Sequence, residues 1–257
     1  MNRVFLTLAS ILFFALAATA QTTNNLSDAE IQGQQLAQEI LQNKPVTNFT
    51  QKGILRIRNS KGATTNIPVT IDTFFNGGNK HWTAHYDASP TTNPLTSIKL
   101  DVIYQDGQSN LYYYFKPDGV WPLKRLEAAP SLNETQIMTP FADSDFWIAD
   151  LGLEFFHWPE QKVLKHETRR TRACTVLEST NPDPSPGSYS HVDSWIDDES
   201  HGIVHAEAYD ANGKLLKVFD PKSFKKVNGQ WELQDMEIRN VQTGSRTWIK
   251  FDLSGKS

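Results

Sequence analysis

The sequence contains seven histidines, and their spacing determines whether they could bind a metal ion. His81 and His85 would share one face of a β-strand but lie roughly 13 Å apart, too far to share one ion. His191 and Asp193 are two positions apart on one strand face and form the best pair. We predict no metal site and no cofactor, with a site assembled by folding as the minor alternative.

Residues that could carry covalent catalysis lack the spacing that catalysis needs. The sequence has no G-x-S-x-G motif, and Gly187-Ser-Tyr-Ser190 follows a proline-rich turn. The carboxylates of Asp197-Asp198-Glu199 fall in a polar turn, where they are expected to be solvated. Cys174 is the single cysteine, which excludes an intrachain disulfide, and we expect it to be a small core residue. We predict that the protein is not an enzyme.

The charge composition bears on possible partners. The chain has 25 Lys and Arg against 29 Asp and Glu, a formal net charge of −4, which argues against binding to nucleic acid. One basic cluster, Arg169, Arg170 and Arg172, is a candidate contact for lipid headgroups or an acidic membrane partner. The alternative is that it forms the solvated face of a strand and turn.

The most aromatic stretch after the first twenty residues lies between Thr139 and Trp158. Ser144 or Asp145 could cap a short helix within it. A helix with this many apolar side chains must pack against another apolar surface. The concave face of a curved sheet is the candidate for that surface. The aromatic segment would then act as a lid whose side chains line a cavity. The alternative is that these side chains fill a closed core and leave no cavity. The candidate ligand contacts are Phe141, Phe146, Trp147, Leu151, Phe155, Phe156 and Trp158.

The first twenty residues have the pattern of an export signal. Arg3 precedes an apolar run from Val4 to Ala18, and Ala18-Thr19-Ala20 is the small-x-small pattern that signal peptidase reads. The run is shorter than a membrane span of about 20 residues. We predict cleavage after Ala20 and a periplasmic protein without an integral membrane segment. An uncleaved N-terminal anchor is the alternative.

The elements that must position these residues are a helix and many strands. Ser27 and Glu30 form a capping box before an amphipathic helix that ends ahead of Pro45. From Gly53 onward, short runs alternate with period two, and turn signals such as Asp106-Gly107, Asn212-Gly213 and Asn228-Gly229 separate several of them. About ten or eleven antiparallel strands are expected, enough for the sheet to curl.

The proline-rich segment 181–187 is the one point where a second domain could begin. The strand pattern is the same on its two sides, so we predict a cleaved signal at 1–20 and a single β domain at 21–257.

Several segments resemble the outer-membrane lipoprotein-sorting proteins, the LolA/LolB-like family. The resemblance is good from roughly Gly119 to Leu253. In the N-terminal third, only the pattern of residues is similar. In the lid, Ala142-Asp143 and Trp147-Ile148-Ala149 depart from that family's usual residues. The segments that carry the resemblance are Phe141-Ala-Asp-Ser-Asp-Phe-Trp-Ile-Ala-Asp-Leu151, Arg172-Ala-Cys-Thr-Val-Leu-Glu178, Tyr189 to Ile196, Ala206 to Lys217, Trp231 to Arg239 and Thr243-Gly-Ser-Arg-Thr247.

The resemblance implies a mainly β fold, in which a single curved antiparallel sheet forms a half-open barrel closed by α-helices. It also implies a monomeric carrier whose apolar cavity takes the acyl chains of a lipoprotein or lipid towards the outer membrane. Inner- and outer-membrane sorting proteins would be its partners. Two alternatives remain: a cavity-based enzyme acting on a small apolar molecule, and an envelope sensor or interaction module of the same fold.

Overall fold

The computed structural model describes residues 26–45, 47–75, 81–90, 97–116, 131–227 and 230–253. The predicted export signal and the Asn228-Gly229 turn lie outside the described residues. Among the described residues, no helix combines the length and the apolar character needed to cross a bilayer.

Twelve strands of the described chain form one antiparallel sheet, in the order β5-β4-β3-β2-β1-β12-β11-β10-β9-β8-β7-β6. The sheet is not closed into a barrel, because β5 and β6 are its two edges. The strands are β1 (Phe49–Arg58), β2 (Thr64–Phe75), β3 (His81–Ala88), β4 (Ile98–Gln105), β5 (Leu111–Phe115), β6 (Glu160–Arg169), β7 (Arg172–Thr180), β8 (Tyr189–Asp197), β9 (Ile203–Asp210), β10 (Leu215–Val227), β11 (Gln230–Asn240) and β12 (Arg246–Asp252). The predicted mainly β fold, with one curved sheet and helices, is confirmed.

The sequence pattern missed one strand, the edge strand β6. Its side chains alternate poorly between buried and exposed, and several are charged. Charged side chains are typical of edge strands, because they discourage pairing with another chain. They also remove the period-two apolar signal by which the other strands are recognised.

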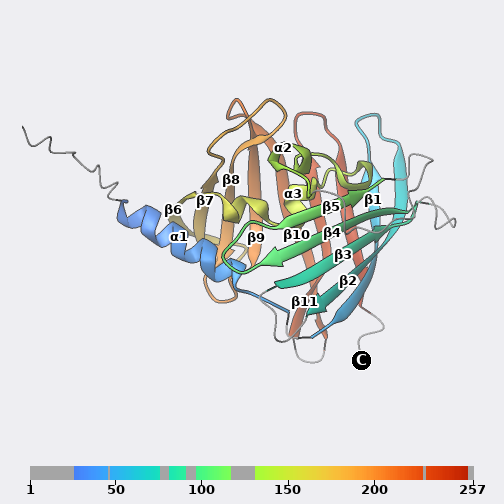
Figure 1. Ribbon diagram of the computed structural model, residues 1–257, viewed down its shortest axis with the longest axis horizontal. Coiled ribbons are helices and arrows are strands. Elements are labelled where there is room, and N and C mark those ends of the chain that lie inside the picture. Colours follow the sequence, from blue (N-terminus) through green and yellow to red (C-terminus); the bar gives the residue numbers. More distant parts are fainter. Residues whose placement is uncertain are drawn as a thin grey trace, which may run out of the picture.

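The sheet curls so strongly that β2–β5 pass in front of β10 and β11, as Figure 1 shows. The short helices α2 (Glu134–Ile137) and α3 (Ile148–Leu151) lie on the concave side of this curl (Figure 1). Hydrogen bonds from β3 and β4 to the carbonyl of Leu151, and an ion pair from β10 to Asp150, place α3 between the two arms of the sheet.

Helix α1 (Asp28–Leu41) covers the concave face at the β6 edge (Figure 1). Its predicted capping box is present, since the Ser27 side chain and the Glu30 side chain each accept from the other's backbone N–H. A Cβ at Gly33 would lie 2.6 Å from the backbone of Gln161. Only glycine therefore lets the helix approach β6 so closely, and Ala37 and Ile40 are buried beside it.

The mid-chain segment 141–157, which we call the lid, is broken into three short pieces: η3 (Phe141–Asp143), α3 and η4 (Glu154–His157). Ala142 and Leu153 adopt left-handed backbone angles, with φ of 51° and 50°, which interrupt any longer helix. The prediction that Ser144 or Asp145 caps a helix here is wrong. The N-cap residue of α3 is Trp147 instead, and its backbone N–H donates to Asp150 Oδ2 at 2.7 Å.

Most of the apolar core lies on the concave face, and a smaller cluster lies on the convex face. The convex cluster contains Cys174, Val176 and Trp195, with Val204 packed against it. The Cys174 side chain is 1% exposed and its thiol is free, as expected of a small core residue.

Candidate ligand-binding site

The concave face of the sheet contains a hollow of about 580 Å³ beneath the lid, which we call the apolar hollow. This volume lies within the range of roughly 300–1,000 Å³ that is usual for small-molecule sites. Alternate residues of the strands face the hollow because successive side chains of a strand point to opposite faces. Its apolar wall is made by Leu55, Val69, Ile71, Ala84, Phe219, Leu233, Met236, Ile249 and Phe251.

The strand register explains why these wall residues meet. Leu55 of β1 pairs with Ile249 of β12, which pairs in turn with Met236 of β11. Residues directly opposite one another share a face, so the three side chains form one row across the floor of the hollow.

The lid closes the hollow with Phe141, Phe146, Leu151 and Leu153. Polar groups reach the lining from the segment after α1, through Asn43 and Lys44, from Gln51 of β1 and Thr73 of β2, and from Asp150 of the lid. The Lys44 ammonium also forms an ion pair with Asp106 in the β4–β5 turn. The lining of the hollow is therefore mostly apolar, with a few polar groups, of which Lys44 carries a positive charge.

The carbonyl of Leu151 attaches the lid to the strands β3 and β4. Tyr86 and Tyr104 both donate to this oxygen from their hydroxyl groups, at 3.2 Å and 3.0 Å. Burial raises the pKa of Tyr86 to about 12, and that of Tyr104 lies well above its usual value for the same reason. Both phenols therefore stay protonated and able to donate at neutral pH.

A second attachment joins the lid to β8 and β10 through the carboxylate of Asp150. The Tyr189 hydroxyl donates to it at 2.9 Å, and Lys217 Nζ lies 3.4 Å from Oδ2. The Lys217 side chain is only 2% exposed, and its ammonium lies 3.6 Å from the ring centroid of Trp147. Burial lowers the pKa of Lys217 to about 8, against the attraction of Asp150. The amine is therefore still mostly charged at pH 7, and Asp150 and Trp147 stabilise that charge.

Two further carboxylates attach the lid at its flanks. Asp145 accepts from the hydroxyl of Thr247 on β12 at 2.8 Å. Glu154 accepts from the hydroxyl of Tyr112 on β5 at 2.8 Å. Burial raises the pKa of Glu154 to about 7 despite that hydrogen bond. The lid is thus attached to strands on several sides by buried polar groups, so it cannot move without breaking hydrogen bonds.

The seven predicted ligand contacts are distributed over three places. Phe141, Phe146 and Leu151 line the apolar hollow. Trp147 stacks on Tyr189, with ring centroids 4.4 Å apart, and Phe155 borders a small void of about 30 Å³. A separate polar depression of about 1,090 Å³ between α1 and the β4–β5 turn is bordered by Phe156 and Trp158.

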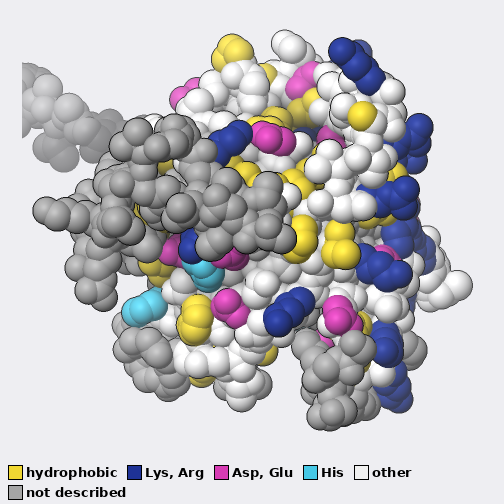
Figure 2. All heavy atoms as spheres, turned by 90° about the vertical axis from the view of Figure 1, so that its right-hand side faces the viewer, with side chains coloured by type: hydrophobic (Ala, Val, Ile, Leu, Met, Phe, Trp, Pro, Cys, Tyr) yellow, Lys and Arg dark blue, Asp and Glu magenta, His cyan; other side chains and the backbone are white. Residues whose placement is uncertain are grey.

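The three predicted headgroup residues lie at the β6–β7 turn, and none is among the residues that line the hollow. Arg169 lies over the ring of Trp195, Arg170 donates to the Pro221 carbonyl and pairs with Asp220, and Arg172 pairs with Asp197 and Glu199. Elsewhere on the surface, Lys and Arg side chains gather along one side of the face in Figure 2. A role for the three arginines with headgroups stays a prediction.

Sequence reasoning missed the strand residues of the wall and the Asp150–Lys217 pair. The alternation of apolar and polar residues along β1 and β12 could have indicated which residues form the wall. However, the face of the sheet that points inward depends on the direction in which the sheet curls. Asp150 and Lys217 are 67 positions apart, and neither has a local pattern that predicts the other.

No curated protein matches the sequence. A family model described as "Uncharacterized protein" matches residues 108–253. This match extends over more than half of the chain, which therefore belongs to that family.

Solved structures show the same fold. A DUF1329 family protein from Desulfovibrio piger has a TM-score of 0.68 and 18% identity, over 90% of this chain and 96% of the other. A putative outer membrane lipoprotein-sorting protein domain from Vibrio parahaemolyticus has a TM-score of 0.69 and 18% identity, over 89% and 95%. A LolA superfamily protein from Nitrosomonas europaea has a TM-score of 0.55 and 18% identity, over 88% and 92%. The LolA-like fold inferred from the sequence is confirmed.

Proposed function

We propose that this protein is a periplasmic carrier that binds an acyl chain of a lipid or lipoprotein in the apolar hollow. The predicted export signal supports the location, and the similarity to lipoprotein-sorting proteins supports the class of cargo. The observation that carries the proposal is the hollow itself, which is apolar and large under a lid of the chain's own residues.

The energetics suit transport of a long apolar tail. A chain of ~16 carbons gains on the order of 13 kcal/mol when it leaves water, at about 0.8 kcal/mol for each methylene group. Ordering of the chain and displacement of the lid reduce this gain. A carrier benefits from that reduction, because its cargo must also leave.

The polar residues that follow α1 would give the cargo a direction. Asn43, Lys44 and Gln51 are among the lining residues, whereas β11 and β12 supply apolar side chains and the lid supplies four apolar side chains together with Asp150. A bound lipid would place its tail against the strands and its polar head beside Lys44, whose ammonium suits an anionic or ester-bearing headgroup.

The test is a binding measurement on a pair of matched variants. Ala84 lines the hollow, and Thr83 precedes it on the same strand and points to the other face. In Ala84→Phe the hollow is partly filled, so affinity for a fluorescent fatty acid should fall at least tenfold. In Thr83→Phe it should stay within twofold of the unchanged protein. Lipid mass spectrometry on the natively purified protein should find co-purified lipid.

The folded state of each variant is checked by thermal unfolding, and Leu233→Trp provides a second way to fill the hollow. Equal binding by the Ala84 and Leu233 variants and the unchanged protein would exclude the hollow as the site. A protein that carries no lipid and binds no probe would exclude the carrier function.

A further inference from the structure

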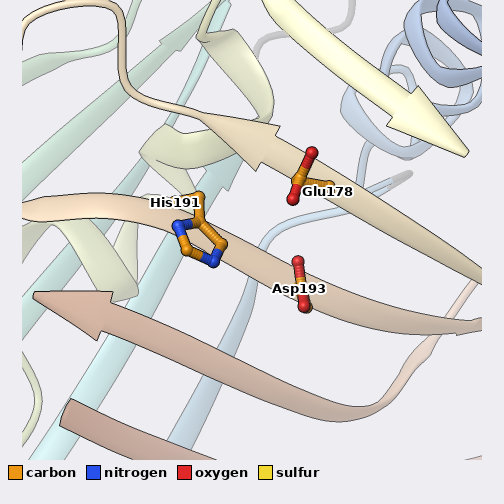
Figure 3. Close-up of side chains that lie close together, drawn as sticks. All are labelled: Glu178, His191 and Asp193. Carbon is orange, nitrogen blue, oxygen red and sulfur yellow. The ribbon is translucent and has the colours of Figure 1, made fainter. Parts of the chain in front are cut away.

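The convex face of β7 and β8, on the opposite side of the sheet from the lid, contains a cluster of side chains whose ligating atoms converge. Glu178 of β7 and Asp193 of β8 are directly opposite in the register, and His191 lies two positions before Asp193 on the same face. One ligating atom from each residue lies within 4.8 Å of the others. Figure 3 shows the two carboxylates and the imidazole around a common space.

Both carboxylates of this cluster lack a protein partner within the described part of the chain. Asp193 Oδ1 is inaccessible to solvent and has no hydrogen bond. Glu178 forms no hydrogen bond or ion pair with any described residue, although Lys162 lies opposite it on β6. Buried carboxylate oxygens are normally paired or bound to a metal, because burying an unpaired charge is expensive.

The neighbouring strand adds negative charge to the cluster. Glu207 of β9 is directly opposite Asp193, so three carboxylates stand side by side across β7, β8 and β9. Like charges directly opposite one another destabilise a sheet. Glu207 differs from the other two because it is hydrogen-bonded to His205 and Tyr209. Glu178 and Asp193 therefore stand in this row of carboxylates without a hydrogen-bond partner among the described residues, although the charge of Lys165 acts on Asp193.

The imidazole of His191 is held in an orientation suited to a metal ligand. Its Nδ1 is hydrogen-bonded to the Ser190 hydroxyl at 3.0 Å, and its ring stacks on Tyr209 with centroids 4.2 Å apart. These contacts fix the ring and leave Nε2 for an ion. In histidines that bind metals, the ring nitrogen that does not bind the ion is usually hydrogen-bonded in this way.

We propose that Glu178, His191 and Asp193 bind a divalent transition-metal ion, with Zn²⁺ as the best match. One imidazole nitrogen and two carboxylate oxygens are ligands that Zn²⁺ accepts at about 2.0–2.2 Å, which places ligands of one ion at most about 4.4 Å apart. Small side-chain rotations bring the three groups to that distance. The ion would neutralise the carboxylates and link β7 to β8, and three protein ligands leave a position for water or a partner's side chain.

The test is calorimetric titration of the full exported protein with Zn²⁺ after removal of bound metals with EDTA. One equivalent of zinc should bind. The affinity of the protein for zinc should fall at least about 100-fold in Asp193→Asn and in His191→Ala. Substitution of residues that only hydrogen-bond to metal ligands already costs about 10–100-fold, and these two residues are proposed as ligands themselves. A rise in the melting temperature with zinc should appear in the unchanged protein and be absent from both variants.

The matched control is His166→Ala. His166 is bonded to Thr175 on β7 and is outside the cluster, so its loss should leave zinc affinity unchanged. Unaltered affinity in Asp193→Asn, or no zinc binding at micromolar concentrations, would overturn the proposal. Parallel titrations use Mn²⁺ and Ca²⁺. Tighter binding of Ca²⁺ that survives His191→Ala would exclude the imidazole as a ligand and the transition-metal assignment with it.

Discussion

The two halves of the concave face differ in how completely the chain fills them. Over β8–β10, the lid places Trp147 against Tyr189 and Phe155 near Val192, and the remaining void is about 30 Å³, room for about two water molecules. Over β1–β3, β11 and β12 the hollow is about 580 Å³. The curl creates space along the whole concave face, but only the second half is left unfilled, because Trp147 and Phe155 of the lid pack over the first.

The largest effect is expected from breaking the attachment at Asp150. Asp150→Ala leaves the Lys217 ammonium buried without its carboxylate and removes the acceptor of the Trp147 N–H. The free energy of unfolding should fall by about 3–5 kcal/mol, as measured by urea denaturation.

The lid offers a matched control for this variant. Asp143 is 78% exposed and pairs with Lys116, so Asp143→Asn should cost less than about 1 kcal/mol. Adding Lys217→Met to Asp150→Ala should recover part of the loss, because the unpaired charge is then gone. A loss in Asp150→Ala no larger than that in Asp143→Asn would contradict the proposed attachment.

A pair of leucines tests the comparison directly. Leu177 of β7 is fully buried beside the filled half, where it pairs with Ser194 of β8, and Leu55 of β1 is 2% exposed and borders the hollow. Leu177→Ala should cost about 3–5 kcal/mol, because it opens a new cavity in packed surroundings. Leu55→Ala should cost about 2–3 kcal/mol, because the space that it vacates would join a hollow that already exists. Chemical denaturation of the two variants gives the difference, and a larger loss at Leu55 would show that the hollow is packed in solution.

A smaller effect is expected from the pH dependence of Glu154. Its pKa is raised by burial from 4.5 to about 7, so the folded state favours the protonated carboxyl. The stabilisation is fully present below pH 4.5 and is lost as the pH rises through 7. Between pH 5 and pH 8 this group alone should lower the free energy of unfolding by on the order of 2–3 kcal/mol.

Glu154→Gln separates this contribution from the rest of the pH profile. The variant keeps a hydrogen-bonding side chain beside Tyr112 but cannot ionise, so its stability should vary less over the same range. Denaturation at pH 5, 6, 7 and 8 measures both profiles. Parallel profiles for the two proteins would mean that Glu154 ionises with its ordinary pKa.

Local signals predicted most of the fold. The capping box at Ser27 and Glu30 and the turn at Asn212-Gly213 each depend on a few neighbouring residues, and the structure contains both. The edge strand β6 was missed because its charged residues conceal the alternation. The helix cap at Ser144 or Asp145 was wrong because the Asp145 carboxylate is occupied by Thr247, about a hundred residues away.

The candidate sites were predictable only in part. The aromatic lid was recognisable from its composition, but only Phe141, Phe146 and Leu151 of its seven predicted contacts reach the hollow. For the proposed metal site, the His191 and Asp193 spacing was visible in the sequence. Glu178 joins them only because β7 pairs with β8 in a register that places it opposite Asp193.

The sequence by itself determined that this chain forms a large antiparallel sheet with one capped helix and an apolar mid-chain segment, because alternation, caps and turns act over a few residues. The tertiary structure alone decided which part of the concave face stays open. That outcome depends on where the curled sheet brings Lys217 to Asp150 and Tyr86 and Tyr104 to Leu151. These contacts join residues far apart in the chain, and they hold the lid between the two arms of the sheet, where Trp147 and Phe155 pack over β8–β10 and the hollow stays open over β1–β3, β11 and β12.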